Sequence, residues 1–425
     1  MKRNKPVSTF RAFRNRNYAL FFYGQSVSQI GTWMQRTAVS WVIYTLTHSA
    51  FMLGLALFAQ QFPSFLLSLL GGIISDRHSR YKILLVTQTA SMVQAILLAV
   101  LILTNHYAVW EILTLSVILG IINAFDVPAR QPMVHEMVNN KEDLPNALAL
   151  NSAMVNIARL VGPAISGIVL QTLGAGICFS LNAVSFLAVI ASLLLMRLPP
   201  FKPPAIKKKI IPELVEGFTY LKQTPIIGLI MLMLTLLSLL VLPYDTMMPV
   251  FAKVIFKGNA ATYGYISSFI GLGAILGSLF MASMKKANKL KTVLLTSITI
   301  LGAGLILFSR INYFPIAMLF AVVIGLGSLL PMTACITILQ MEAAPHMRGR
   351  VMSYVAMAYF GMLPLGSLLI GTISQKITAP LTMLCQGIIA IIIAALFSKF
   401  LRKDKIDKRN IKRLTEQEEI VMEKI

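Results

Sequence analysis

The sequence predicts an all-α membrane protein with twelve transmembrane helices in two six-helix bundles. Of its 425 residues, 56% are hydrophobic and 13% are charged, whereas about a quarter of a soluble domain is charged. The mean hydropathy is +0.75. The apolar residues form twelve segments near the ~20 residues that cross a bilayer. A proline- and lysine-rich stretch from Leu198 to Lys222 separates the sixth segment from the seventh.

We expect spans at 18–44, 52–75, 83–104, 109–129, 146–172, 176–196, 226–251, 263–284, 291–309, 315–341, 351–375 and 380–400. The chain then divides into a basic N-terminus (1–17), a first bundle (18–197), a linker (198–223), a second bundle (224–400) and a basic tail (401–425).

The net charge of +22 reflects membrane topology and does not indicate nucleic-acid binding. Of the 38 Lys and Arg residues, 32 lie in segments on one side of the predicted bundle, four lie in loops on the other side and two lie within spans. By the positive-inside rule both termini are cytoplasmic, as in a multi-pass protein of a bacterial inner membrane. We expect the basic tail to lie on anionic lipid headgroups.

The two halves resemble each other at a nearly constant offset. Gly72 near the end of the second span corresponds to Gly277 near the end of the eighth, and Pro163 in the fifth corresponds to Pro364 in the eleventh. Parallel repeats of this kind are related by an axis along the membrane normal. The substrate site lies between them near the midplane.

The first candidate residues lie in helix 1, where Gln25, Gln29, Trp33 and Arg36 fall within about 80° of one face. A polar stripe on a lipid-spanning helix must face protein or water, and its neutral members also serve as hydrogen-bonding contacts between helices. Applied to all spans, this reasoning gives ten candidate cavity residues: Gln25, Gln29, Trp33, Arg36, Asn123, Asn156, Arg159, Tyr244, Asp245 and Tyr359.

The loop after the second span reads Gly72-Ile-Ile-Ser-Asp76-Arg77-His-Ser79-Arg80-Tyr-Lys82. It resembles the GxxxDRxGRR/K signature of the major facilitator superfamily, with Ser79 in place of the usual glycine. In that family the aspartate meets the N-terminus of helix 11, where free N–H groups and the helix dipole favour an anion. The resemblance implies the major facilitator fold and a cytoplasmic latch. The basic residues of the loop are also explained by topology alone.

The latch would comprise Gly72, Asp76, Arg77, Arg80, Asp126 and Arg130. Asp126 lies near the inner end of helix 4. It could bind a proton or a cationic substrate, but we favour a pairing with Arg80 or Arg130 within the latch.

Four further stretches are similar to the drug and siderophore exporter branch of the superfamily, which includes enterobactin-type exporters and macrolide efflux pumps. They lie at 124–131, 142–152, 158–163 and 347–351. The resemblance covers Phe10 to about Phe400. It implies a monomer that works by alternating access, but it does not transfer a substrate.

Helix 5 contains Gly162, Pro163 and Gly167, similar to the GPxxGG pattern of antiporters, with Ser166 replacing a glycine. Proline and glycine soften a membrane helix and permit close packing. The pattern indicates either an export-related kink or ordinary packing. The RxxQG signature associated with proton antiport is absent from helix 4.

Charged residues within the spans are the sharpest candidates. A central arginine costs about 2.5–3.5 kcal/mol on insertion scales, so it needs a partner or an aqueous cavity. Arg36 lies in the outer half of helix 1, and Asp245 lies in the outer half of helix 7, its repeat partner. We expect this pair to close the outer mouth of the cavity when the inner side is open. The alternative is that each charge is solvated or bonded within its own helix.

The sequence indicates no enzyme, cofactor or metal site, because it has no Walker loop, zinc-helix motif or hydrolase triad. Our prediction is a secondary active transporter that uses protons to export small amphipathic or cationic compounds, with Asp245 as the candidate proton carrier. Siderophore or lipid-like substrates, uptake, and a non-transporting sensor or partner protein remain alternatives.

Overall fold

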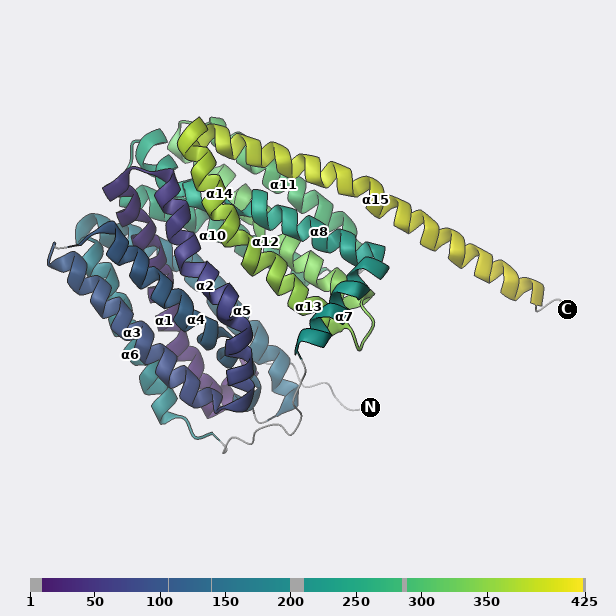
Figure 1. Ribbon diagram of the computed structural model, residues 1–425, viewed down its shortest axis with the longest axis horizontal. Helices are drawn as coiled ribbons and strands as arrows, with labels where there is room; N and C mark the ends of the chain where they lie inside the picture. The colour runs from purple at the N-terminus through teal and green to yellow at the C-terminus, as the bar shows by residue number, and fades with distance from the viewer. Residues whose placement is uncertain (1–9, 106, 139, 199–209, 285–288, 423–425) are drawn as a thin grey trace.

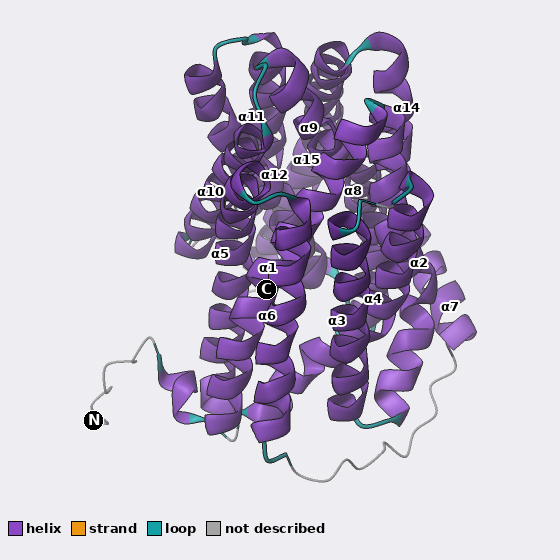
Figure 2. Ribbon diagram, turned by 90° about the vertical axis from the view of Figure 1, so that its left-hand side faces the viewer, coloured by secondary structure: helices purple, strands orange, loops and turns teal. Residues whose placement is uncertain are grey.

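The computed structural model describes residues 10–105, 107–138, 140–198, 210–284 and 289–422, and in these residues it is helical without strands (Figure 2). The N-terminal half comprises α1 (Arg16–Thr47), α2 (Ala50–Arg77), α3 (Arg80–Leu103), α4 (Val109–Met137), α5 (Leu144–Thr172) and α6 (Ala175–Leu195). The C-terminal half includes α10 (Ala260–Ser283), α11 (Leu290–Arg310), α12 (Phe314–Glu342) and α15 (Ala379–Met422). Two further crossings of this half, described below, are interrupted.

The twelve-crossing arrangement agrees with the predicted fold class. Eleven crossings in the described residues are long and apolar enough to span a membrane. The remaining one, α1, has 32 residues but buries polar side chains, among them Gln25, Ser28 and Gln35. Within the N-terminal half, α1 packs on α5 and α6, and α4 packs on α2 and α3. Within the C-terminal half, α12 packs on α10 and α11.

The halves touch mainly through two helix pairs, α2 with α14 (Met362–Ile377) and α5 with α10. In both pairs glycines bring the backbones together. A Cβ added at Gly54 would lie 2.4 Å from the Ser367 carbonyl oxygen, and one added at Gly264 would lie 2.5 Å from the Pro163 carbonyl oxygen. Small residues permit such close approach between membrane helices.

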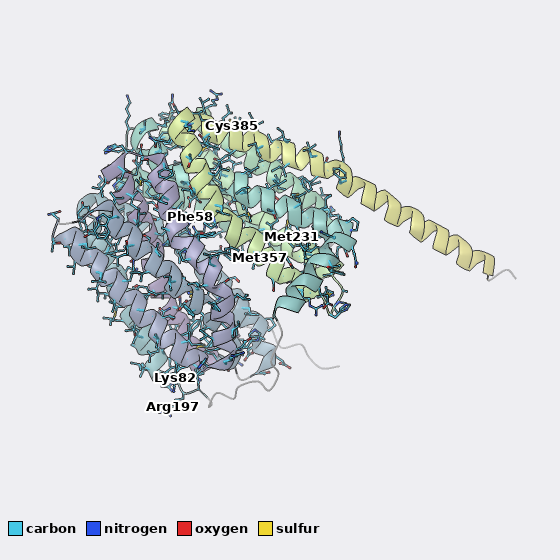
Figure 3. The ribbon with its side chains drawn as sticks, viewed as in Figure 1. Phe58, Lys82, Arg197, Met231, Met357 and Cys385 are labelled. Carbon is cyan, nitrogen blue, oxygen red and sulfur yellow. The ribbon has the colours of Figure 1, made fainter. Side chains whose placement is uncertain are left out.

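These contacts lie toward one end of the molecule, which we name the far end. There the Gln375 side chain of α14 accepts hydrogen bonds from the Ala50 amide (2.9 Å) and the Ser49 hydroxyl (3.1 Å). It thereby caps the first turn of α2. The halves diverge toward the other end, named the linker end, which carries the α2–α3 turn and the helix α7 (Figure 1). Lys82 and Arg197 lie at the linker end, whereas Cys385 lies at the far end (Figure 3).

The seventh crossing is not the continuous helix expected at 226–251. It consists of α8 (Pro225–Leu240), the 3₁₀ segment η3 (Leu242–Met247), the short α9 (Met248–Val250) and the π-helical segment η4 (Phe251–Ile255). Pro243 and Pro249 lack the N–H groups that a regular helix needs. Buried Gln386 of α15 donates to the carbonyls of Leu240 and Val241, both at 3.3 Å. The break is therefore stabilised by a distant helix, as irregular backbone in a membrane requires.

The eleventh crossing is interrupted in a similar way. It runs as α13 (Arg348–Ala356), the π-helical segment η6 (Met357–Gly361) and α14. Pro364 follows the π-helical segment and cannot donate to the preceding turn. Such π segments are rare and are often found at functional sites.

The expected linker contains a helix, α7 (Ile210–Gln223), while 199–209 lie outside the described residues. It packs on the C-terminal half, where Glu216 pairs with Arg350 and the Tyr220 hydroxyl accepts from the Ala344 amide at 3.1 Å. At the N-terminus the short η1 (Arg11–Arg14) is held by a pair between Arg11 and Asp143. Helix α15 continues through the expected tail and extends beyond the bundle (Figure 1).

Candidate functional site

An ion pair joins the two halves in the interior of the bundle. Arg36 of α1 lies 3.7 Å from Asp245 of η3, and their side chains are 31% and 41% exposed. Ionised side chains within a membrane face the bundle interior or a water-filled cavity. The residual exposure therefore indicates that the pair borders an aqueous space between the halves. The structure places together the two residues that we expected to meet.

Trp33 forms a platform for two arginines. The Arg36 guanidinium lies 5.1 Å from the centre of its ring, and the Arg159 guanidinium lies 5.8 Å away. Both distances suit cation–π contacts, which stabilise cations by about 0.5–2 kcal/mol depending on desolvation. Arg159 occupies the middle of α5, one turn before the Gly162–Pro163 step. The site thus gathers three charged groups, two positive and one negative.

A small cavity of about 20 Å³ lies among these side chains, enough for roughly one water molecule. Its wall comes from α1, α5, η3 and α10: Trp33, Arg36, Thr37, Arg159, Pro163, Asp245, Tyr263, Ser267 and Ile270. Tyr263 is buried, stacks on Trp41 at 6.2 Å, and interacts with Ser40 and Ser267. The cavity is therefore narrow in this conformation, with aromatic packing beside it.

Sequence reasoning missed the α10 wall of the cavity. Tyr263, Ser267 and Ile270 follow the same helical spacing that identified the stripe on helix 1. Tyr263 and Ser267 lie in an apolar span, where a tyrosine and a serine cannot be told from ordinary packing residues by sequence alone.

Two predicted residues lie on the irregular segments. Asp245 lies in the 3₁₀ segment of the seventh crossing, and Tyr359 lies in the π segment of the eleventh, half-buried against Phe360. Tyr244, the residue before Asp245, does not line the cavity. Tyr244 is 3% exposed and bonds with Ser328 inside the C-terminal half. Adjacent residues point about 100° apart on an α-helix and about 120° apart on a 3₁₀ helix, so Tyr244 and Asp245 face different sides of the seventh crossing.

Tyr359 is also absent from the wall of this cavity, and four further predicted cavity residues lie outside it. Gln25 and Gln29 precede Arg36 by about 16 and 10 Å along α1, at ~1.5 Å per residue; Gln25 is buried and Gln29 half-buried. Asn123 is half-buried on α4, and Asn156 donates to the Ser152 carbonyl of its own helix at 3.0 Å.

A buried polar network within the N-terminal half also escaped sequence reasoning. Asn182 donates to Gln35 at 2.7 Å, Gln35 donates to Gln94 at 3.0 Å, and Gln94 donates to the Leu115 carbonyl at 3.1 Å. The network joins α1, α3, α4 and α6. It satisfies buried amides within one half and does not face the other half.

The residues of the expected latch form two separate groups. Buried Asp126 accepts from Thr87 (3.0 Å) and Gln88 (2.7 Å) of α3 and pairs with Arg130 at 3.3 Å. Arg80 pairs with Glu136 and lies 3.7 Å from Asp76. Arg77 is exposed. The pairing of Asp126 with Arg130 is one of the two alternatives that we had favoured.

Asp76 does not reach the first turn of α13 in this conformation. Its side chain is 66% exposed, and a Cβ added at Gly72 or Gly349 would meet no atom of the described chain within 4 Å. The reason is the divergence of the halves at the linker end. We therefore expect the latch contact only in a conformation whose linker end is closed.

The glycines of helix 5 serve close packing. A Cβ at Gly162 would lie 2.5 Å from Trp33 Cβ, and one at Gly167 would lie 2.9 Å from the Ala260 carbonyl oxygen. Pro163 remains inside the continuous helix α5. Ser166, which departs from the antiporter pattern, donates to the Met34 carbonyl of α1 at 3.0 Å.

Comparison with known proteins gives a consistent result. Residues 7–424 match a family model described as transmembrane secretion effector. The chain is 27% identical to the staphyloferrin A transporter of Staphylococcus aureus, with 91% of this chain and 96% of that protein covered. It is 22% identical to the multidrug efflux pump Tap of Mycolicibacterium fortuitum, covering 89% and 95%.

Among solved structures, the chain is similar in fold to a bacterial homologue of the human lysosomal transporter Spinster in an inward-facing, occupied conformation. The TM-score is 0.70 at 13% identity, with 91% of this chain and 97% of that chain covered. The similar proteins are transporters and not enzymes, in agreement with the prediction from the sequence.

Proposed function

Because this chain belongs to the transmembrane secretion effector family of major facilitator transporters, we propose that it exports small amphipathic compounds with energy from the proton gradient. Transport by alternating access is the shared property of this fold. The direction, the coupling ion and the substrate class form our proposal. The names of its relatives, a staphyloferrin A transporter and a multidrug efflux pump, support export of either siderophore-like or drug-like molecules.

We place the linker end in the cytoplasm of a bacterial cell and the far end outside its inner membrane. The support is the charge distribution, because Lys and Arg accumulate in cytoplasmic loops. Both termini are then cytoplasmic, and the basic end of α15 can bind anionic lipid headgroups. The protein acts as a monomer, since each chain carries a complete pair of halves around its own site.

The ion pair between Arg36 and Asp245 is the observation that carries the coupling proposal. The pair joins the halves while the linker end is open. Asp245 takes up a proton while the far end is open and releases it to the cytoplasm while the linker end is open, after which the ionised carboxylate pairs with Arg36. A bound substrate then displaces this pair, which weakens closure at the far end. Asp245 is thus both the proton carrier and part of the gate. Closure of the linker end then lets Asp76 meet the first turn of α13, whose free N–H groups favour an anion.

The test is efflux in inside-out vesicles under an imposed pH gradient, with a fluorescent dye and a macrolide as substrates. We compare the wild type, Asp245→Asn, and the matched control Glu142→Gln, whose side chain is 77% exposed at the linker end. Gradient-dependent accumulation should persist in the control and be lost in Asp245→Asn.

Equal accumulation in Asp245→Asn would remove Asp245 from coupling and leave the export proposal in place. An absence of flux for these compounds would direct the test to siderophores and lipid-like solutes. If those also failed to move, a non-transporting partner or sensor role would replace export.

A further inference from the structure

The charged side chains inside the described spans do not balance. Away from the helix ends, Asp126 is paired with Arg130 at 3.3 Å and Asp245 with Arg36 at 3.7 Å. Arg159 has no carboxylate within 4 Å among the described residues. Its guanidinium lies over the ring of Trp33. The cavity of Trp33, Arg36, Arg159 and Asp245 therefore carries one excess positive charge.

An uncompensated arginine is costly in this place. Arg159 lies in the middle of α5, and a charge at the bilayer centre persists only with a partner or an aqueous cavity. While the linker end is open, water supplies that solvation. When both ends close around a bound molecule the water is largely excluded, and the excess charge needs a counter-ion.

We infer that the exported compound carries an anionic group, such as a carboxylate, that binds to Arg159 during closure. This inference rests on the proposed export function and specifies its substrate class. One negative charge brings the set of Arg36, Arg159 and Asp245 to neutrality. Arginine also presents a planar pair of donors that matches a carboxylate. The Trp33 ring beside both arginines provides an apolar surface for the rest of the molecule.

A cationic compound fits this site less well. It would meet the positive charge of Arg159 and would compete with Arg36 for Asp245. The geometry thus reverses the cationic preference that the sequence led us to consider.

The test uses three dansyl probes that share one fluorophore: dansyl-glutamine (one carboxylate, anionic), dansyl-glutamine amide (neutral) and dansyl-cadaverine (cationic). Binding to the full-length protein in lipid nanodiscs is followed by dansyl emission. Transport of the same probes is followed in proteoliposomes under a pH gradient. The variants are Arg159→Gln, Arg159→Lys and the control Arg310→Gln, which removes an exposed arginine at the far end of α11.

The expected result is that dansyl-glutamine binds the wild type and Arg310→Gln at least about tenfold more tightly than dansyl-cadaverine does. Arg159→Gln should lose this preference. Arg159→Lys should retain a weaker preference, because lysine keeps the positive charge but lacks the planar pair of donors. Thermal melting of each variant separates lost binding from lost folding, and Arg159→Lys keeps the test decisive if Arg159→Gln does not fold.

Equal or tighter binding of the cationic probe, or an unchanged preference in Arg159→Gln, would overturn the anion inference while transport of any probe would still support export. If no probe were bound or moved by any of these proteins, the anion inference would fail, whereas the export proposal would be decided by the vesicle efflux assay described above.

Discussion

Replacing Gly54 by alanine should shift the protein away from the conformation described above. The new methyl group would lie 2.4 Å from the Ser367 carbonyl oxygen, whereas ordinary contact begins at 3.4 Å. The obstacle is backbone and cannot rotate away, so α2 and α14 must separate by about 1 Å. Overpacking of this kind costs about 1–3 kcal/mol. Because the contact exists only when the far end is closed, the ratio of the two conformations should change by about 5–150-fold.

Thiol labelling measures this ratio. Ser267→Cys places a thiol in the cavity wall, in a background with Cys385→Ser; the other two cysteines, Cys178 and Cys335, are buried. A membrane-impermeant maleimide is applied to whole cells, from the side where we place the far end. Labelling should be slow in the parent protein, which keeps Gly54, and faster by the predicted ratio when Gly54→Ala is added.

The matched control is Gly72→Ala on the same helix. It gains the same helix propensity, ~1 kcal/mol, but its methyl group meets no described atom within 4 Å. It should not speed labelling, and it should slow labelling if Gly72 packs against α13 in the other conformation. Equal labelling rates for Gly54→Ala and the parent protein would refute the reasoning that the glycine contact holds the far end closed.

Three further outcomes are expected. Arg36→Asp and Asp245→Arg should each abolish efflux, whereas the double variant should recover part of it; a double variant no better than either single one would show that the two do not act as a pair. Gln375→Leu removes two hydrogen bonds across the far end and should favour opening of the far end by about 0.5–1.5 kcal/mol per bond. The same labelling rate measures this change, and Gln375→Glu is the control that keeps the acceptor oxygen. Asp126→Asn should lower the melting temperature, because it disturbs a buried group with three partners, while Asp76→Asn at an exposed site should not; equal melting would contradict a structural role for Asp126.

The sequence predicted the site best where ionised residues interrupt apolar spans. Ionised residues are unusual in apolar spans, so Arg36, Arg159 and Asp245 could be identified individually. The repeat offset then placed Arg36 near Asp245, and the structure has them 3.7 Å apart. The residues that line the same cavity from α10 were not distinctive, since Tyr263 and Ser267 also suit helix packing.

Other features depend on contacts that a linear reading does not contain. The break after α8 is stabilised by Gln386 of the last crossing, and prolines elsewhere, such as Pro163, remain within regular helix. Proline alone therefore did not predict where a crossing is interrupted. The latch was expected from resemblance, but one conformation shows only one set of end contacts, so Asp76 lies apart from α13.

The glycine contacts also determine how motion is amplified. Gly54 lies near the start of α2, and Arg77 ends the helix about 35 Å away at ~1.5 Å per residue. If α2 turns about the point where it touches α14, each degree of rotation displaces the α2–α3 turn by about 0.6 Å by this length. A tilt of roughly 15° would then move that turn by about 9 Å. The backbones of Gly54 in α2 and Gly371 in α14, which lie against each other, would shift very little. The far end is thus the pivot of this rotation. Because α2 is long, the loss of one ion pair near the pivot can produce a large opening or closing movement at the linker end.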